Sequence, residues 1–425
     1  MTTSGKRLLF GIMSVFLIVL AMPAFANNPI TLRFLHKWPG DSWMPYWEDV
    51  VARFEKENPG IKISMEAVAD EPIKEKLRVM MGGSNVPDIF FTWNGEFLNK
   101  FAKANVIRDI TPYLDKDPEF RDSFVPSLMA GGKGRDGKQY GLPVRVSAKF
   151  FIYNKKTYED AGLKVPTTWE EFLANCEVLK QKGITPLMLG NLAPWASCHF
   201  LTTFNAMMVP EEIWRRDYDP AHGEFKDEGY TQALSMLKEL NDKGYFNEGV
   251  NSTQFAQSRE LFIGGTGGMI YDEMTTFKRR YEDGMPGQWD FFLCPPMKGQ
   301  RGNPKLITGA PDMFAISATS EHPEEAFKFL KFIFNQENAA KFTKDTGFPN
   351  CVKGAMNGDN TIPQVVAAMK ILEEASGLTG WLDTEMEAAV VDKYLGNLQQ
   401  LFNGKSPEEI MQEVRDEAAF VAEGN

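Results

Sequence analysis

Tryptophans and acidic side chains recur at points where the sequence predicts the end of a strand or the start of a helix. Four of the nine Trp residues, Trp38, Trp93, Trp195 and Trp381, lie at such points. The face of an indole ring can stack on an apolar ring face, and a carboxylate can accept two hydroxyl hydrogen bonds that its charge strengthens. These residue types could bind a ligand that has apolar faces and hydrogen-bonding groups along its edge.

Polar residues in the same loops, on the predicted crossover and at other strand ends complete a candidate ligand-binding set. The set comprises His36, Trp38, Asp41, Trp93, Asn94, Glu96, Arg145, Ser147, Trp195, Asp272, Glu273, Asp312, Trp381 and Asp383. Each member also has a plainer interpretation, because a loop Trp can pack on its own loop and an Asp such as Asp41 or Asp383 can cap a helix. We prefer Trp195 and Trp381 as stacking rings, and Glu273 and Asp312 as polar contacts.

Catalytic groups do not assemble from the sequence. Asp272 and Glu273 are adjacent, so on a strand they point to opposite faces and cannot flank one bond. The four His residues have no metal-ligand spacing, and no Gly-x-Ser-x-Gly elbow is present. We therefore predict a binding protein with no catalytic residue, metal or cofactor. A secreted carbohydrate-active enzyme, and a binder of a non-sugar solute such as a polyol or polyamine, stay open as alternatives.

Alternating strands and helices are predicted to position the candidate residues. Strands are expected at 30–35, 61–65 and 87–91, and helices at 45–57 and around 73–80. This order predicts an α/β fold with mostly parallel strands, in which loops at the strand ends face the ligand.

The segment from Gln139 to Phe172 is expected to contain a strand, a crossover, a second strand and a helix. Tyr140 to Pro143 and Lys149 to Asn154 predict the two strands, and the small and polar residues between them, which include Arg145 and Ser147, predict the crossover. Thr168 and Glu171 have the spacing of a capping box at the start of the helix.

The N-terminus has the pattern of an export signal. Lys6 and Arg7 precede an apolar run from Leu8 to Leu20, which is short for a bilayer span, and 24–26 (AFA) fits a small-x-small cleavage site. We predict cleavage after Ala26 and a periplasmic protein; the alternative is a membrane anchor. The remaining 399 residues fit two domains, and their acidic balance argues against a nucleic-acid partner.

Export would place the four cysteines in an oxidising compartment, where they allow three pairings. Cys176 and Cys198 could form a disulfide, but Cys176 also lies on the apolar face of the predicted 169–182 helix, where a buried free thiol is common. The sequence leaves both states open.

A series of landmarks runs through almost the whole mature chain. They are FEKENPGIKI at 54–63, PDIFF at 87–91, the 139–172 segment, GGMIYDEM at 267–274, HPEEAFKFLKFIFNQE at 322–337 and LFNGKSPEEIMQE at 401–413. In this order they resemble family 1 extracellular solute-binding proteins of ABC importers, the maltose-binding-protein-like, sugar-binding family.

The resemblance implies a two-lobed α/β fold, the type II periplasmic-binding-protein or Venus-flytrap fold. It places the N-terminal lobe at 27–144 plus 297–349 and the C-terminal lobe at 145–296 plus 350–425, after a signal peptide at 1–26. It also implies a monomer that captures a carbohydrate by hinge closure and delivers it to the membrane permease of an ABC importer. The four loop Trp residues favour a di- or oligosaccharide.

Overall fold

The computed structural model describes residues 1–2, 29–82 and 85–424. The predicted signal peptide lies outside these described residues except for its first two positions. Within the described part of the chain, no helix combines the length and the apolar character that a bilayer span requires.

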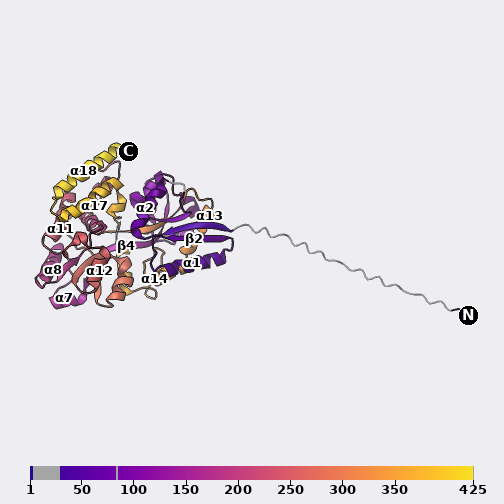
Figure 1. The fold of residues 1–425 in the computed structure, drawn as a ribbon, viewed down its shortest axis with the longest axis horizontal. Coiled ribbons are helices and arrows are strands. Elements are labelled where there is room, and N and C mark those ends of the chain that lie inside the picture. The colour runs from indigo at the N-terminus through magenta and orange to yellow at the C-terminus, as the bar shows by residue number, and fades with distance from the viewer. Residues whose placement is uncertain (3–28, 83–84, 425) are drawn as a thin grey trace.

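One long strand, β4 (Gly141–Asn154), connects two α/β halves of the molecule (Figure 1). The sheet order is β2-β1-β3-β9-β4-β6-β5, and β7 also pairs with β4. We call the part around β1, β2, β3 and β9 the first half, and the part around β5, β6 and β7 the second half. The strands are β1 Ile30–His36, β2 Ile61–Ala67, β3 Ile89–Thr92, β5 Thr185–Met188, β6 Gly267–Glu273, β7 Trp289–Phe292 and β9 Gly309–Ile316, with a separate pair formed by β8 Leu306–Ile307 and β10 Gly377–Leu378.

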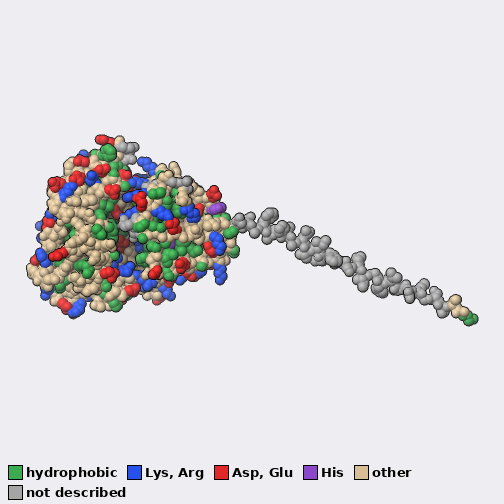
Figure 2. All heavy atoms as spheres, in the orientation of Figure 1, with side chains coloured by type: hydrophobic (Ala, Val, Ile, Leu, Met, Phe, Trp, Pro, Cys, Tyr) green, Lys and Arg blue, Asp and Glu red, His purple; other side chains and the backbone are tan. Residues whose placement is uncertain are grey.

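Helices pack around each half, and the surface is hollowed between the halves (Figure 2). The first half carries α1 Met44–Glu57, α2 Asp70–Met81, α3 Gly95–Lys103, α4 Thr111–Asp115, α5 Pro118–Asp122, α6 Pro126–Ala130, α13 Pro323–Ile333 and α14 Gln336–Thr346. The second half carries α7 Lys155–Ala161, α8 Trp169–Gln181, α9 Trp195–Met208, α10 Glu211–Asp217, α11 Glu228–Asp242, α12 Phe255–Ile263, α16 Leu382–Glu385, α17 Ala388–Phe402 and α18 Pro407–Gly424. The remaining elements are α15 Pro363–Glu374, the 3-10 helices η1 Val250–Ser252 and η2 Met274–Thr276, and the π-helix η3 Phe277–Glu282.

The structure corrects two expectations about the sheet. The predicted crossover is part of the continuous strand β4, because residues on both sides of Arg145 pair with β9, which lies far away in the sequence. The register shifts between Pro143 and Arg145, where proline cannot donate to the ladder. The strands are also not mostly parallel, since β9 pairs antiparallel with both β3 and β4, and β4 pairs antiparallel with β6 and β7.

Local signals in the sequence define the start of α8. Thr168 Oγ1 accepts a hydrogen bond from the Glu171 backbone N–H at 3.2 Å, as the capping box predicts. The Glu171 carboxylate accepts from the backbone N–H of Thr167, one residue before the expected partner. The first contact satisfies a donor that the first turn of the helix leaves open, and the second connects the residue before the N-cap to the same turn.

All four cysteines are free thiols in the structure. Cys176 and Cys198 are both fully buried, and burial raises the pKa of each thiol. Of the two states that the sequence left open, the structure has the buried thiol.

Candidate ligand-binding cavity

A cavity of about 250 Å³ lies between the two halves. Its lining comes from the ends of strands and from helix starts. Lys37 and Trp93 directly follow β1 and β3, and Glu273 is the last residue of β6. The complete lining is Lys37, Lys74, Trp93, Arg145, Ser147, Trp195, His199, Glu273, Asp312, Trp381, Asp383 and Thr384.

The second half contributes an aromatic wall to the cavity. Trp195 is the first residue of α9, and His199 follows one turn later on the same face. The His199 ring stacks on Trp381 with centroids 4.4 Å apart and lies 5.4 Å from the Trp195 ring. Such a row of flat rings is suited to stacking against the apolar faces of a cyclic ligand.

The first half and the connecting strand contribute a charged wall. Asp312, on β9, accepts hydrogen bonds from Arg145 Nε at 2.5 Å and from Lys37 Nζ at 3.4 Å. Lys37 Nζ also lies 4.9 Å from the centre of the Trp93 ring. Because these buried charges have partners, they can be held in place at the edge of a ligand without the full cost of an isolated buried ion.

Two further carboxylates face the cavity from the second half. Glu273 accepts a hydrogen bond from Ser147 Oγ at 2.8 Å and lies 4.0 Å from the buried Lys149 Nζ. Asp383 lies 4.0 Å from both Lys74 Nζ and His199 Nε2. The cavity therefore combines its aromatic wall with charged hydrogen-bond donors from the first half and β4 and with carboxylate acceptors from both halves.

Burial decides the charge of the imidazole in the aromatic wall. It lowers the pKa of His199 well below its usual range, and the nearby Lys149 and Lys74 add to that effect. His199 is therefore neutral near pH 7, so the row formed by Trp195, His199 and Trp381 carries no charge.

The structure brings eight of the fourteen candidate residues together in the cavity. These are Trp93, Arg145, Ser147, Trp195, Glu273, Asp312, Trp381 and Asp383. Asp272 and Glu273 point to opposite sides of β6, as the strand geometry predicted. Glu273 lines the cavity, whereas Asp272 is buried against Arg259, with its Oδ2 2.7 Å from Arg259 Nε.

His36, Trp38 and Asp41 lie away from the cavity. Trp38 folds back into the core of the first half, where its ring stacks on Trp47 at 5.6 Å, and its backbone N–H donates to His36 Nδ1. Burial lowers the pKa of His36 to about 3. Asp41 is exposed before α1. Trp38 still lies beneath the site, since Arg145 extends over its ring at 5.3 Å.

Asn94 and Glu96 also lie outside the cavity lining, at the start of α3. Asn94 Nδ2 donates to Glu385 Oε1 at 2.8 Å, and Glu96 pairs with Arg135 at 3.1 Å. Both side chains therefore have partners in the wall beside the cavity.

Four lining residues were absent from the predicted set, namely Lys37, Lys74, His199 and Thr384. Lys37 shares the loop of His36, and its place directly after β1 is a usable signal. His199 is four residues after Trp195, a spacing that puts both on one helical face. Lys74 and Thr384 lie within helices and carry no comparable signal.

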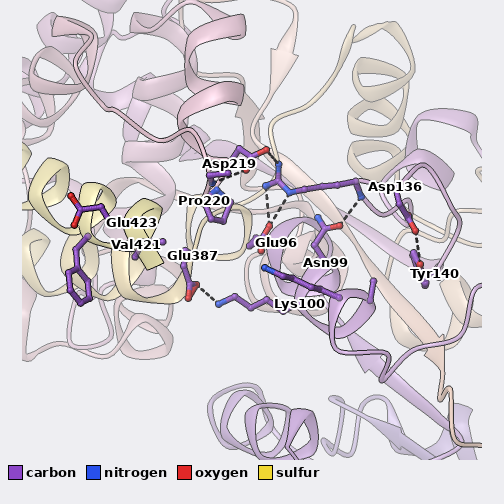
Figure 3. Close-up of a pocket in the computed structure, with 15 residues that line it drawn as sticks. Glu96, Asn99, Lys100, Asp136, Tyr140, Asp219, Pro220, Glu387, Val421 and Glu423 are labelled. Carbon is purple, nitrogen blue, oxygen red and sulfur yellow. Dashed lines mark hydrogen bonds and ion pairs between the residues drawn. The ribbon is translucent and has the colours of Figure 1, made fainter. Parts of the chain in front are cut away.

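A larger groove of about 980 Å³ lies next to the α3 and α16 contact (Figure 3). Ion pairs connect the two halves across it. Lys100 of α3 pairs with Glu387 beside α17, and Arg135, before β4, pairs with Asp219, after α10, at 2.7 Å. Arg135 also pairs with Glu96 within the first half. We call this region the outer groove, in contrast to the inner cavity with its aromatic wall.

Comparisons with known proteins define the class of protein. Residues 39–340 match the bacterial extracellular solute-binding protein family, so the chain belongs to that family. It is 25% identical to the multiple sugar-binding protein of Streptococcus mutans over 73% of each chain. It is 22% identical to the diacetylchitobiose binding protein DasA of Streptomyces coelicolor, over 92% of this chain and 89% of DasA.

A solved structure has the same fold. A chitin oligosaccharide binding protein superposes with a TM-score of 0.84 at 23% identity, covering 94% of this chain and all of the other. The predicted two-lobed solute-binding-protein fold is thereby confirmed, and the α/β class with it. The family consists of solute-binding proteins, and among the described residues no group of three or more His, Cys, Asp or Glu side chains could hold a metal ion.

Proposed function

We propose that the protein is a periplasmic receptor that captures a carbohydrate in the inner cavity and delivers it to the permease of an ABC importer. The observation that carries this proposal is the aromatic wall of Trp195, His199 and Trp381 facing the paired charges of Arg145 and Asp312. Stacking faces combined with charge-assisted acceptors meet the two chemical requirements of a sugar ring. The sugar-binding relatives support the same ligand class.

We propose that the lobes are 27–144 plus 297–349 and 145–296 plus 350–425, following a signal peptide cleaved after Ala26. Arg145 and Ser147 then lie on the connecting strand, where they can contact a ligand in both the open and the closed form. Closure adds contacts from the opposite lobe, and a ligand favours the closed form only through these additional contacts. No chemical step follows capture in this mechanism, and the receptor acts as a monomer without a cofactor.

The size of the cavity supports a ligand that fills it with one or two sugar rings. Its volume of about 250 Å³ is just below the range of roughly 300–1,000 Å³ that is usual for small-molecule sites. Because Trp38 lies in the core, three Trp rings rather than four line the cavity. We therefore expect a disaccharide, or the end of a longer chain that continues into the outer groove.

A thermal-shift screen of the full chain against mono-, di- and oligosaccharides, polyols and polyamines tests the ligand class. A ligand that binds only the folded protein raises its melting temperature. We expect a disaccharide to give the largest shift and no sugar to be hydrolysed during incubation. A shift with polyols or polyamines alone would contradict the proposal, and so would release of hydrolysed sugar.

A further inference from the structure

Helix α16, whose Asp383 and Thr384 line the inner cavity, contacts α3, whose Glu96 lines the outer groove. Glu385 is the central side chain of this contact. Asn94, which precedes α3 in the first half, donates a hydrogen bond from Nδ2 to Glu385 Oε1 at 2.8 Å. Glu385 is the last residue of α16 in the second half. This hydrogen bond therefore connects the two halves of the molecule.

Two glycines, one from each half, make room for the Glu385 carboxylate. A Cβ atom on Gly95 would lie 2.5 Å from Glu385 Cδ, and a Cβ atom on Gly380 would lie 2.1 Å from Glu385 Oε1. Both glycines also have positive φ angles, +67° and +76° respectively, which favour glycine. The carboxylate thus occupies a notch that a side chain at either glycine would fill.

The notch is a poor environment for a negative charge. Burial raises the pKa of Glu385 to about 7, and the carboxylate of Glu96 acts in the same direction. The positive charges of Arg215 and Arg135 and the hydrogen bond from Asn94 oppose this shift without cancelling it. The titratable and charged groups around the notch are Glu96 and Lys100 on α3, Arg135 before β4, Arg215 on α10, Tyr218 after α10, Asp383 on α16 and Glu387 beside α17.

We propose that the contact between Asn94 and Glu385 is a latch that takes up a proton when the two halves close on each other. The proposal rests on the proposed function in one respect, namely that the halves move apart and together. When they separate, Glu385 leaves Asn94 and Gly95 and meets water, where a Glu side chain ionises at its ordinary pKa. Closure returns it to the notch, where the neutral form is favoured.

The sign of the pH effect follows from the two pKa values. Above about pH 7 the carboxylate is ionised in both forms, and below its ordinary value of 4.5 it is protonated in both. Between these limits the closed form binds more protons, so a falling pH favours closure. From pH 8 to pH 5.5 the ratio of closed to open protein should rise by up to roughly 30-fold by this linkage.

Distance measurements on the full chain without ligand test the latch. Spin labels on V79C, in α2, and L192C, before α9, report the separation of the two halves, since both positions are exposed. The half-buried Cys294 is changed to Ser so that it does not take up label. We expect the shorter distance to gain population between pH 8 and pH 5.5, with circular dichroism checking that the fold is intact at both values.

Two variants distinguish the effect of the Glu385 carboxylate on the pH response from that of the neighbouring Glu387. Glu385→Gln keeps an acceptor for Asn94 but has no charge, so it should give the shorter distance equally at both pH values. Glu387→Gln removes the neighbouring carboxylate that pairs with Lys100, and it should keep the pH dependence of the unmodified chain. Identical distances at pH 8 and pH 5.5 in the unmodified chain, or an unchanged pH response in Glu385→Gln, would overturn the latch. Since no sugar is needed, this result is independent of the outcome of the ligand screen.

Discussion

The two walls of the inner cavity differ in their chemistry. Both lysines that line it, Lys37 and Lys74, come from the first half, whereas the row of three contacting rings comes from the second half. Rings can hold a ligand by stacking without exact alignment, whereas hydrogen bonds from charged groups need defined geometry. The difference suggests an order of events in which the sugar first settles on the aromatic wall and closure then brings the charged wall against its hydroxyl groups.

The largest effect is expected for the charged wall, from Asp312→Asn. This change leaves Lys37 and Arg145 without the carboxylate that both contact. Removing one partner of a buried ion pair typically costs about 3–5 kcal/mol of stability. Urea unfolding should show this loss in the free protein. A loss of sugar affinity with unchanged stability would contradict the structural role of Asp312 in this wall.

The aromatic wall should respond in the opposite way, with a loss of affinity and little loss of stability. Trp195 is only partly buried, so Trp195→Ala should weaken sugar binding by about 2 kcal/mol, roughly 30-fold, as loss of a central aromatic anchor does. Calorimetric titration and the melting temperature measure the two effects. Trp214→Phe, at a buried Trp that does not line the cavity, is the matched control and should leave affinity unchanged. An unaltered affinity in Trp195→Ala would remove Trp195 from the site.

Acid should destabilise both halves through a buried histidine in each. His36 and His199 have lowered pKa values in the folded protein, so the unfolded chain binds more protons below pH 6.5 and stability falls as the pH falls. Between pH 6.5 and pH 5 each should cost about 2 kcal/mol. The raised pKa of Glu385 acts in the opposite direction over this pH range, so urea unfolding of Glu385→Gln at both pH values measures the sum for the two histidines. Adding His222→Gln, at an exposed His, should leave that loss unchanged; a stability of Glu385→Gln that does not change with pH would contradict neutral burial of His36 and His199.

The smallest effect is expected where the two walls meet, at Glu273. Glu273→Gln can keep the hydrogen bond from Ser147 but loses the charge that strengthens contacts to hydroxyl groups. Sugar affinity should fall by about 1 kcal/mol, roughly 5-fold, in calorimetric titration. Asp290→Asn, on β7 away from the cavity lining, should have no effect. Equal losses in the two variants would indicate a general charge effect instead of a contact at Glu273.

Local patterns in the sequence predicted much of the fold. The capping box at Thr168 and the apolar spacing of Ile73, Leu77 and Met80 depend on neighbours within a few residues, and both correspond to helices in the structure. The same reasoning placed Trp93 and Glu273 at strand ends, where they line the cavity. These features are accessible because their causes are local.

Features that depend on distant partners could not be predicted in this way. Around Arg145 the apolar residues Val144, Val146 and Ala148 alternate with polar ones, which is a strand pattern that the crossover interpretation overlooked. Its antiparallel partner, β9, begins at Gly309 and could not be predicted from this pattern. The sequence position of Trp38 after a strand is typical of a ligand-facing loop residue, but its ring packs on Trp47 in the core. Lys74 lines the inner cavity because the packing of the first half places α2 beside it, and this packing depends on residues far away in the sequence.

The central claim is that a carbohydrate binds between the two walls, and a crystal structure with the sugar that gives the largest thermal shift tests it most directly. We predict density for a sugar ring stacked on Trp195 or Trp381, with its hydroxyl groups within hydrogen-bond distance of Arg145, Glu273 or Asp312. A sugar bound elsewhere on the molecule, with the inner cavity filled only by water, would contradict the account.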